Sequence, residues 1–197
     1  GRTQYSTKFS QYPSVMMIYN GVKVGHPDEM AIDICLRLLS NTSGTGLLDK
    51  LTIDGDLLGG NAQMLSFREQ GRNVVMGIPY YDEAQRRFES NKSVEKKLKE
   101  AVQQIAAGNF EQWVVDAIKI NLCRDFDLQM ESNEFKAQLL MNAFINEEDL
   151  NKVLDYKNVV MNVSFDDIKR VAKEYLSDNY IVLYNEQGKP EKAQKIQ

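Results

Sequence analysis

The chain has 197 residues, of which 43% are hydrophobic and 26% are charged, and its formal net charge is −4. This length and composition suit one large globular domain or two small ones with a sizeable core. The mild negative charge argues against a nucleic-acid surface, which needs a basic face. No apolar run approaches the roughly 18 residues that a membrane-spanning helix requires.

The chain opens with GRTQYSTKFS, a stretch to which the sequence assigns no element. Because it lacks an initiating methionine, we expect a processed or excised piece of a longer protein, and the missing targeting signal says nothing about compartment. The next segment, YPSVMMIYNGV, predicts a strand that follows a proline and ends at Asn20-Gly21.

Residues 26–30, HPDEM, are one residue short of a zinc-peptidase signature. In the H-x-x-E-H pattern, two histidines on one helical face bind zinc and the glutamate activates the bound water. Here Met30 replaces the second histidine, and His26 is the only histidine in the chain. Pro27 favours the first turn of a helix and disfavours helical backbone before it. We therefore predict a plain helix over 27–40, with two acidic residues in its first turn, and no metal site.

Neither of the two cysteines is predicted to act in catalysis. Cys35 lies among the apolar residues of the predicted helix, nine residues or about two and a half turns from His26. Cys123 lies in another predicted helix, with no histidine left to activate it. Their spacing matches no metal site, and we expect Cys35 to be a buried apolar residue.

The following segment, SNTSGTGLLDKL, predicts a turn and a short helix. Its glycines do not indicate a phosphate-binding loop, because no strand precedes them and no Gly-Lys-Ser/Thr follows. Two strands are then expected, roughly over 58–67 and 72–79. They are predicted to pair as an antiparallel hairpin through residues 69–72.

The second half of the chain is predicted to be mainly helical. One helix begins near residue 93 and stops at Gly108. The next begins at Asn109, which forms a capping-box-like pattern with Gln112, and runs to about residue 130. In this helix Trp113 is interpreted as a core residue because it shares a helical spacing with other apolar residues.

Further helices are expected over 132–145, 146–160 and 163–176. The acidic cluster 147–149 is interpreted as a helix N-terminus rather than a cation site, and Ser164 is expected to cap the last helix. A final strand follows over 179–185. This order of elements predicts an α+β fold, with layered helices on a mostly antiparallel sheet.

Three segments in this order resemble a known family. They are HPDEMAIDICLRLLSNTSGTGLLDKL, FEQWVVDAIKINLCRDFDLQMESNEFKAQLLMNAFI and VSFDDIKRVAKEYLSDNYIVLYNEQGKPEK. Their order and spacing resemble the non-catalytic domain of pitrilysin/insulinase-type zinc peptidases. This is the inverzincin group, and residues 26–30 are similar to its zinc-binding signature. The likeness is greatest to the long bacterial members that carry four such domains on one chain.

The resemblance implies a clamshell of two halves, in which zinc and the catalytic glutamate belong to the first domain. Active members use an arginine–tyrosine pair after the short helix of the final domain to hold substrate. At that place this sequence has Thr52, Ile53, Gly59 and Gly60, which favours the second of four domains. The implied organisation is one non-catalytic domain over 1–185 and the start of an interdomain linker over 186–197.

The function implied by the resemblance is that of a non-catalytic module of a zinc-dependent endopeptidase. Such a module walls the peptide chamber and supports a sister catalytic domain, which holds the zinc. Its partners are other domains of the same polypeptide and unfolded peptides, with weak self-association expected, and the compartment implied is the bacterial periplasm. The alternative is a structural or peptide-binding relative whose whole parent protein has lost protease activity. No catalytic or metal-binding residue is assigned to this chain.

Overall fold

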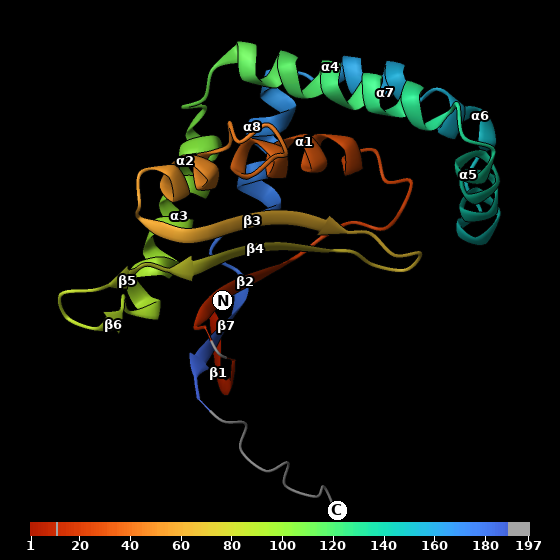
Figure 1. The fold of residues 1–197 in the computed structure, drawn as a ribbon. Coiled ribbons are helices and arrows are strands. Elements are labelled where there is room, and N and C mark those ends of the chain that lie inside the picture. The colour runs from red at the N-terminus through yellow and green to blue at the C-terminus, as the bar shows by residue number, and fades with distance from the viewer. Residues whose placement is uncertain (11, 189–197) are drawn as a thin grey trace, which may run out of the picture.

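A computed structural model describes residues 1–10 and 12–188 (Figure 1). Its elements in chain order are β1 (Thr3–Ser10), β2 (Ser14–Asn20), α1 (Glu29–Leu39), α2 (Leu47–Ile53), β3 (Leu57–Leu65), β4 (Arg72–Pro79), β5 (Tyr81–Asp82), β6 (Arg87–Phe88), α3 (Asn91–Ala107), α4 (Gln112–Gln129), α5 (Asn133–Asn146), α6 (Leu150–Leu154), α7 (Tyr156–Asn162), α8 (Phe165–Tyr175) and β7 (Tyr180–Gln187).

The main sheet has five strands in the order β1-β7-β2-β4-β3. Only the β1–β7 pair is parallel, and the other three pairs are antiparallel. A separate two-stranded hairpin, β5–β6, lies at one end of the sheet (Figure 1). The predicted α+β fold with a mostly antiparallel sheet is therefore confirmed.

One face of the sheet is covered by helices and forms the core. Strand β2 alternates strictly, so that Val15, Met17 and Tyr19 are buried on that face. Helices α1 and α3 pack there, α8 packs against both of them, and α2 packs on the edge strand β3 (Figure 1). The predicted helix over 27–40 is confirmed as α1, whose apolar residues are almost all buried.

A second helical layer lies outside the first. Helices α4 and α7 run side by side above α1 and α8, and α5 projects from the end of this layer (Figure 1). Lys119 of α4 is buried and donates to the backbone carbonyl oxygens of Met161 and Val163 at the end of α7. A buried ammonium group thus ties the two helices together.

Two predicted helix ends are confirmed by their capping geometry. Helix α3 ends at Gly108, whose φ of +82° is a left-handed conformation that glycine adopts without strain. Helix α8 begins at Ser164, whose hydroxyl accepts from the Asp167 N–H at 3.0 Å, while the Asp167 carboxylate accepts from the Ser164 N–H at 3.0 Å. This reciprocal pair is a capping box.

Other predictions in the helical half are wrong. Helix α4 begins after Glu111, not at Asn109, because the Asn109 N–H is bonded to the Gln104 carbonyl in the turn that ends α3. The single helix predicted over 146–160 is divided into α6 and α7 at Asp155. Asp155 is both the C-cap of α6 and the N-cap of α7, and its backbone, with φ −81° and ψ +12°, departs from helical geometry.

The acidic cluster 147–149 is only partly a helix N-terminus. Asp149 caps α6, since its carboxylate accepts from the Asn151 N–H at 2.9 Å. Glu147 instead ends α5 with a φ of +57°. Trp113 is not a core residue: its side chain is 61% exposed, because α4 turns Val115, Ile118 and Leu122 inward instead.

The two ends of the chain also differ from the predictions. The first ten residues include β1, although every described side chain of this strand is exposed and no alternating pattern marks it. Pairing with β7 makes it a strand. Strand β7 itself continues to Gln187, two residues beyond the predicted strand, and residues 189–197 of the predicted linker lie outside the described residues.

Candidate functional site: the uncovered face of the sheet

The segment that mimics a zinc signature is a helix start. Asp28 is the N-cap of α1, and the His26 ring lies before the helix, where Nδ1 accepts from the Asp28 N–H at 3.1 Å. The Glu29 carboxylate accepts from the Gly25 N–H at 2.7 Å, and burial raises the pKa of Glu29. A lone imidazole and a thioether do not make a zinc ligand set.

Asp28 joins the start of α1 to α8. Its carboxylate is bonded to the Arg170 guanidinium and accepts from the Tyr175 hydroxyl at 2.9 Å. The bond to Arg170 lowers the pKa of Asp28, and burial opposes this effect without reversing it. The carboxylate is therefore used to hold two core helices together.

The cysteines lie where the sequence predicts. Cys35 is buried in α1, and burial raises the pKa of its thiol to about 12, so the reactive thiolate is disfavoured. Cys123 is half-buried in α4. Within residues 1–10 and 12–188, no group of three or more His, Cys, Asp or Glu side chains is arranged to hold a metal ion.

The four residues that the resemblance places at the arginine–tyrosine pair lie at the end of α2 and in the edge strand β3. Thr52 donates its hydroxyl to the Leu48 carbonyl within α2, and Ile53 is exposed at the helix end. Gly59 and Gly60 lie in the edge strand β3. A Cβ on Gly60 would lie 2.8 Å from the Cβ of Leu48, so glycine allows α2 to approach the sheet closely.

The most distinctive surface is the sheet face opposite the helices, here called the open sheet face. Its members are set by register: Ile18 lies opposite Ile181 and Val74, and Met16 lies opposite Leu183 and Met76. Parallel pairing with β7 adds Tyr5 from β1. Tyr5 is 58% exposed and Ile181 is 44% exposed. Figure 1 shows α1, α2 and α8 on the other side of the sheet.

The centre of the open sheet face is apolar and uncharged. Two methionines, Met16 and Met76, face each other across β2 and β4. Methionine side chains are flexible and adapt to differently shaped apolar ligands. Along β3, Asn61 and Gln63 add amide groups beside them. Such a surface can contact apolar side chains of an extended peptide, but it contains no nucleophile or general base.

Strand β2 carries a sequence signal for this face. Strand β2 reads SVMMIYN and is apolar at both even and odd positions. Strands of this kind are usually buried on both faces, whereas a strand covered on one side alternates with polar residues. An apolar set at 16 and 18 therefore indicates that the second face also has a partner.

A buried carboxylate fastens the outermost strand beside this face. Glu95 of α3 accepts from the Arg2 guanidinium at 2.6 and 2.9 Å, from the Tyr180 hydroxyl at 2.7 Å, and from the Tyr184 hydroxyl. Burial alone would raise the pKa of Glu95, but these donors outweigh it and lower the pKa to about 2. Arg2 precedes β1, so this cluster attaches β1 to the core.

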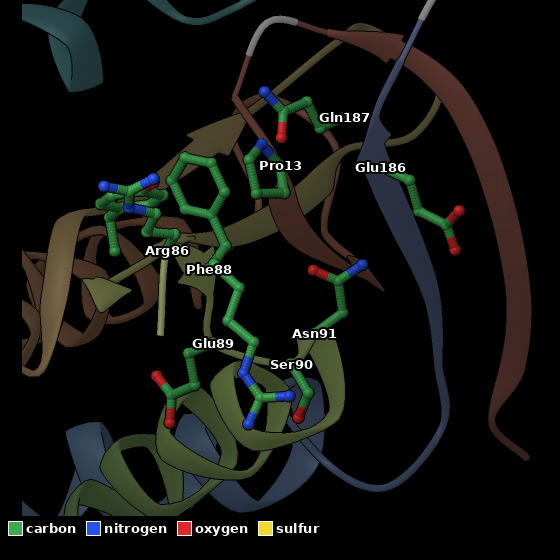
Figure 2. A pocket seen from close by; sticks show the side chains of 10 residues that line it. Pro13, Arg86, Phe88, Glu89, Ser90, Asn91, Glu186 and Gln187 are labelled. Carbon is green, nitrogen blue, oxygen red and sulfur yellow. The ribbon is translucent and has the colours of Figure 1, made fainter. Parts of the chain in front are cut away.

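A surface hollow lies at the far end of the sheet, between the β5–β6 hairpin, the start of α3 and the end of β7 (Figure 2). Figure 2 shows Pro13 and Phe88 on one side of it and Asn91 and Glu186 on the other. Its Glu89 carboxylate is already bonded to Ser93 and Lys97. The hollow brings together no catalytic set.

Comparison with known proteins agrees with this picture. No family model matches the chain. The zinc protease PqqE of Helicobacter pylori is 25% identical over 153 residues, which cover 78% of this chain and 33% of that protein. The chain therefore spans about a third of the length of this curated relative. Among the described residues, no helix combines the length and apolar character needed to cross a membrane.

Solved structures share the fold. A protease from Helicobacter pylori superimposes with a TM-score of 0.80 at 19% identity, covering 94% of this chain and 44% of that chain. An M16 peptidase inactive domain from Pseudomonas fluorescens gives a TM-score of 0.75 at 14% identity, covering 97% of this chain and 44% of that chain. An inactive peptidase domain from Bordetella parapertussis gives a TM-score of 0.75 at 16% identity, covering 97% of this chain and 98% of that chain. The chain therefore has the fold of M16 peptidase domains, and its sequence similarity to the Helicobacter pylori zinc protease supports the resemblance to the insulinase-like family.

Proposed function

We propose that this domain is a non-catalytic part of a zinc-protease-like parent, in which it walls the peptide chamber and supports a catalytic sister domain. The observation that carries the proposal is the open sheet face, which is apolar, uncharged at its centre and free of catalytic groups. The domain offers peptides a surface without reacting with them. Zinc belongs to the sister domain, because the donors available here do not fit it.

The relatives support this assignment without settling the parent's activity. One is described as a zinc protease, two as inactive peptidase domains, and another as the periplasmic protease PqqL from Escherichia coli. The alternative is a parent that binds peptides but no longer cleaves them. The open sheet face serves either protein, and a complete H-x-x-E-H motif in the sister domain separates the two.

The peptide-binding part of the proposal is tested with a fluorescent, permanently unfolded protein such as reduced and carboxymethylated lactalbumin. We expect the domain to bind it weakly, and the double variant Tyr5→Ser/Ile181→Ser to bind it at least fivefold more weakly. Both residues are exposed, so the fold should persist. Ile53→Ser is the matched control, because Ile53 is 75% exposed on α2, away from the open sheet face. An equal loss of binding in Ile53→Ser would refute the assignment of peptide binding to the open sheet face.

The non-catalytic part of the proposal is tested on the same purified domain. After dialysis we expect far less than one zinc per chain, and no chelator-sensitive cleavage of unfolded peptides. A full equivalent of zinc that disappears in His26→Ala would contradict the proposal. So would cleavage that remains after a control for co-purified protease.

A further inference from the structure

Helix α5 is apolar on two opposite faces. Phe135, Leu139 and Ala143, spaced four residues apart, are turned toward the body of the domain, where Phe135 meets the Phe126 ring of α4 edge to face at 6.3 Å. The other face carries four large apolar side chains at i, i+1, i+4 and i+5. They are Leu140, Met141, Phe144 and Ile145, exposed at 52%, 52%, 85% and 53%.

A helix with this pattern is normally buried on all sides. Ala143 is the only buried residue of α5, and the helix has 14 residues, a length at which an isolated helix is marginal in water. In Figure 1 it projects from the end of the outer layer, with α6 as its immediate neighbour. The outward face of α5, residues 140, 141, 144 and 145, therefore has the character of a contact surface.

The charges around this face are strongly one-sided. Residues 131–149 contain five carboxylates, Glu131, Glu134, Glu147, Glu148 and Asp149, against one base, Lys136, which gives −4. The whole chain also has a net charge of −4, so the acidic and basic residues among the remaining 178 are equal in number. Glu134 lies seven residues before Met141, which places it on the same helical side. Among described residues, Glu147 pairs with Arg68, Asp149 caps α6 and the Glu148 side chain lies against Gly25, so Glu131 and Glu134 form the acidic rim beside this face.

From this combination we infer that the outward face of α5 binds a peptide segment that folds as a basic amphipathic helix. The apolar side of such a segment covers residues 140, 141, 144 and 145, and its lysines and arginines meet the acidic rim. A second copy of the chain would bring like charges together around the same apolar face, which is unfavourable. Recognition of an amphipathic helix by an apolar surface uses anchors at this i, i+3, i+4 spacing.

The test uses the 197-residue chain and three labelled 18-residue peptides. The first is a leucine/lysine helix with its leucines on one face, the second has glutamate at every lysine position, and the third is a scrambled leucine/lysine sequence. Fluorescence anisotropy should show that the first binds at least tenfold more tightly than the other two. Its affinity should fall as salt is raised, because exposed charge pairs are screened.

Matched variants assign the binding to α5. Phe144→Ser should weaken binding of the leucine/lysine peptide at least tenfold, and Glu131→Gln/Glu134→Gln should weaken it several-fold and reduce its salt dependence. Ile120→Ser, a 61%-exposed residue on α4, is the control and should leave binding unchanged. Circular dichroism confirms that each variant is folded. Equal binding of all three peptides would overturn the inference. It would also be overturned by self-association that Phe144→Ser abolishes while the leucine/lysine peptide fails to bind.

Discussion

The inner and outer helical layers use apolar residues in opposite ways. In α1, α3 and α8, the apolar residues form one stripe that is buried in the core, and the opposite side is polar. In α4 and α5, apolar residues occur on both sides, and only one side is buried within the described residues. The inner layer supplies most of the core, to which the inward sides of α4 and α7 add Val115, Ile118, Leu122 and Val160. The outer layer has an unused apolar side that a single domain does not need for folding.

The open sheet face extends the same contrast to the strands. The covered face contains Val15, Met17 and Tyr19, all 2% exposed or less, whereas the open face keeps exposed apolar side chains such as Ile181. Exposed apolar patches of this kind mark contact surfaces in many proteins. The domain thus has two separate candidate surfaces, one on the sheet and one on α5, with the core between them.

The largest expected loss of stability comes from a substitution in the inner helical layer. Leu98 of α3 is fully buried, and Leu98→Ala should lower the free energy of unfolding by about 3 kcal/mol, the usual cost of a cavity left by a buried leucine. Leu140→Ala makes the same change on the outward face of α5, where we expect a difference of about 0.5 kcal/mol or less. Urea unfolding of both variants measures the difference. Equal losses would show that the outward face of α5 is packed in solution.

This contrast also explains how much of the fold was predictable. In α1 the apolar residues, including Cys35, lie on one face of the helix, and a proline and two acidic residues mark its start. This pattern therefore predicts a helix with one buried face. In α4 the same kind of spacing is met on both sides of the helix. The spacing therefore favoured Trp113 as a core residue, whereas tertiary packing places Val115 inside and leaves Trp113 exposed. Local periodicity cannot rank two apolar faces of one helix.

Long-range pairing accounts for the other failures. Strand β1 has no apolar alternation, and it exists because β7, some 180 residues later, pairs with it and because Glu95 holds Arg2. The strand order that creates the open sheet face is equally non-local. The sequence could exclude a metal centre at His26, since that argument needs only residue types, but it could not show which apolar surfaces remain uncovered.

The next largest effect concerns charges in the two layers. Glu95→Gln leaves Arg2 and two tyrosine hydroxyls without a carboxylate, and we expect a loss of 2–3 kcal/mol at pH 7, of the order known for broken buried pairs. Asp127→Asn removes an exposed ion pair with Lys157 on the outer layer and should cost about 0.5 kcal/mol or less. Thermal unfolding of the two variants under identical conditions tests this order.

The pH dependence of stability should change in the same variant. The pKa of Glu95 is about 2 in the folded domain and has an ordinary value of 4.5, so the carboxylate stabilises the fold above about pH 4.5. That contribution is lost as the pH falls from about 4.5 to 2. In Glu95→Gln the loss of stability across this interval should be smaller by about 3 kcal/mol than in the parent domain. Parallel acid profiles for the parent and Glu95→Gln would contradict the structure of the cluster.

The smallest expected effect shows whether α5 unfolds together with the core helices or independently of them. Ser164 and Ser132 are both N-caps whose hydroxyls accept from the backbone N–H three residues later, at 3.0 and 3.3 Å. Ser164→Ala should cost about 1 kcal/mol of global stability, because α8 packs against α1 and α3 in the core. Ser132→Ala should hardly change global unfolding, since α5 adds only one buried residue, but it should speed amide hydrogen exchange within 133–146. If Ser132→Ala lowered global stability as much as Ser164→Ala, α5 would be part of the same cooperative unit as the core. Its outward apolar face would then be an ordinary exposed surface of a rigid element, rather than one that becomes fully ordered only when it is covered.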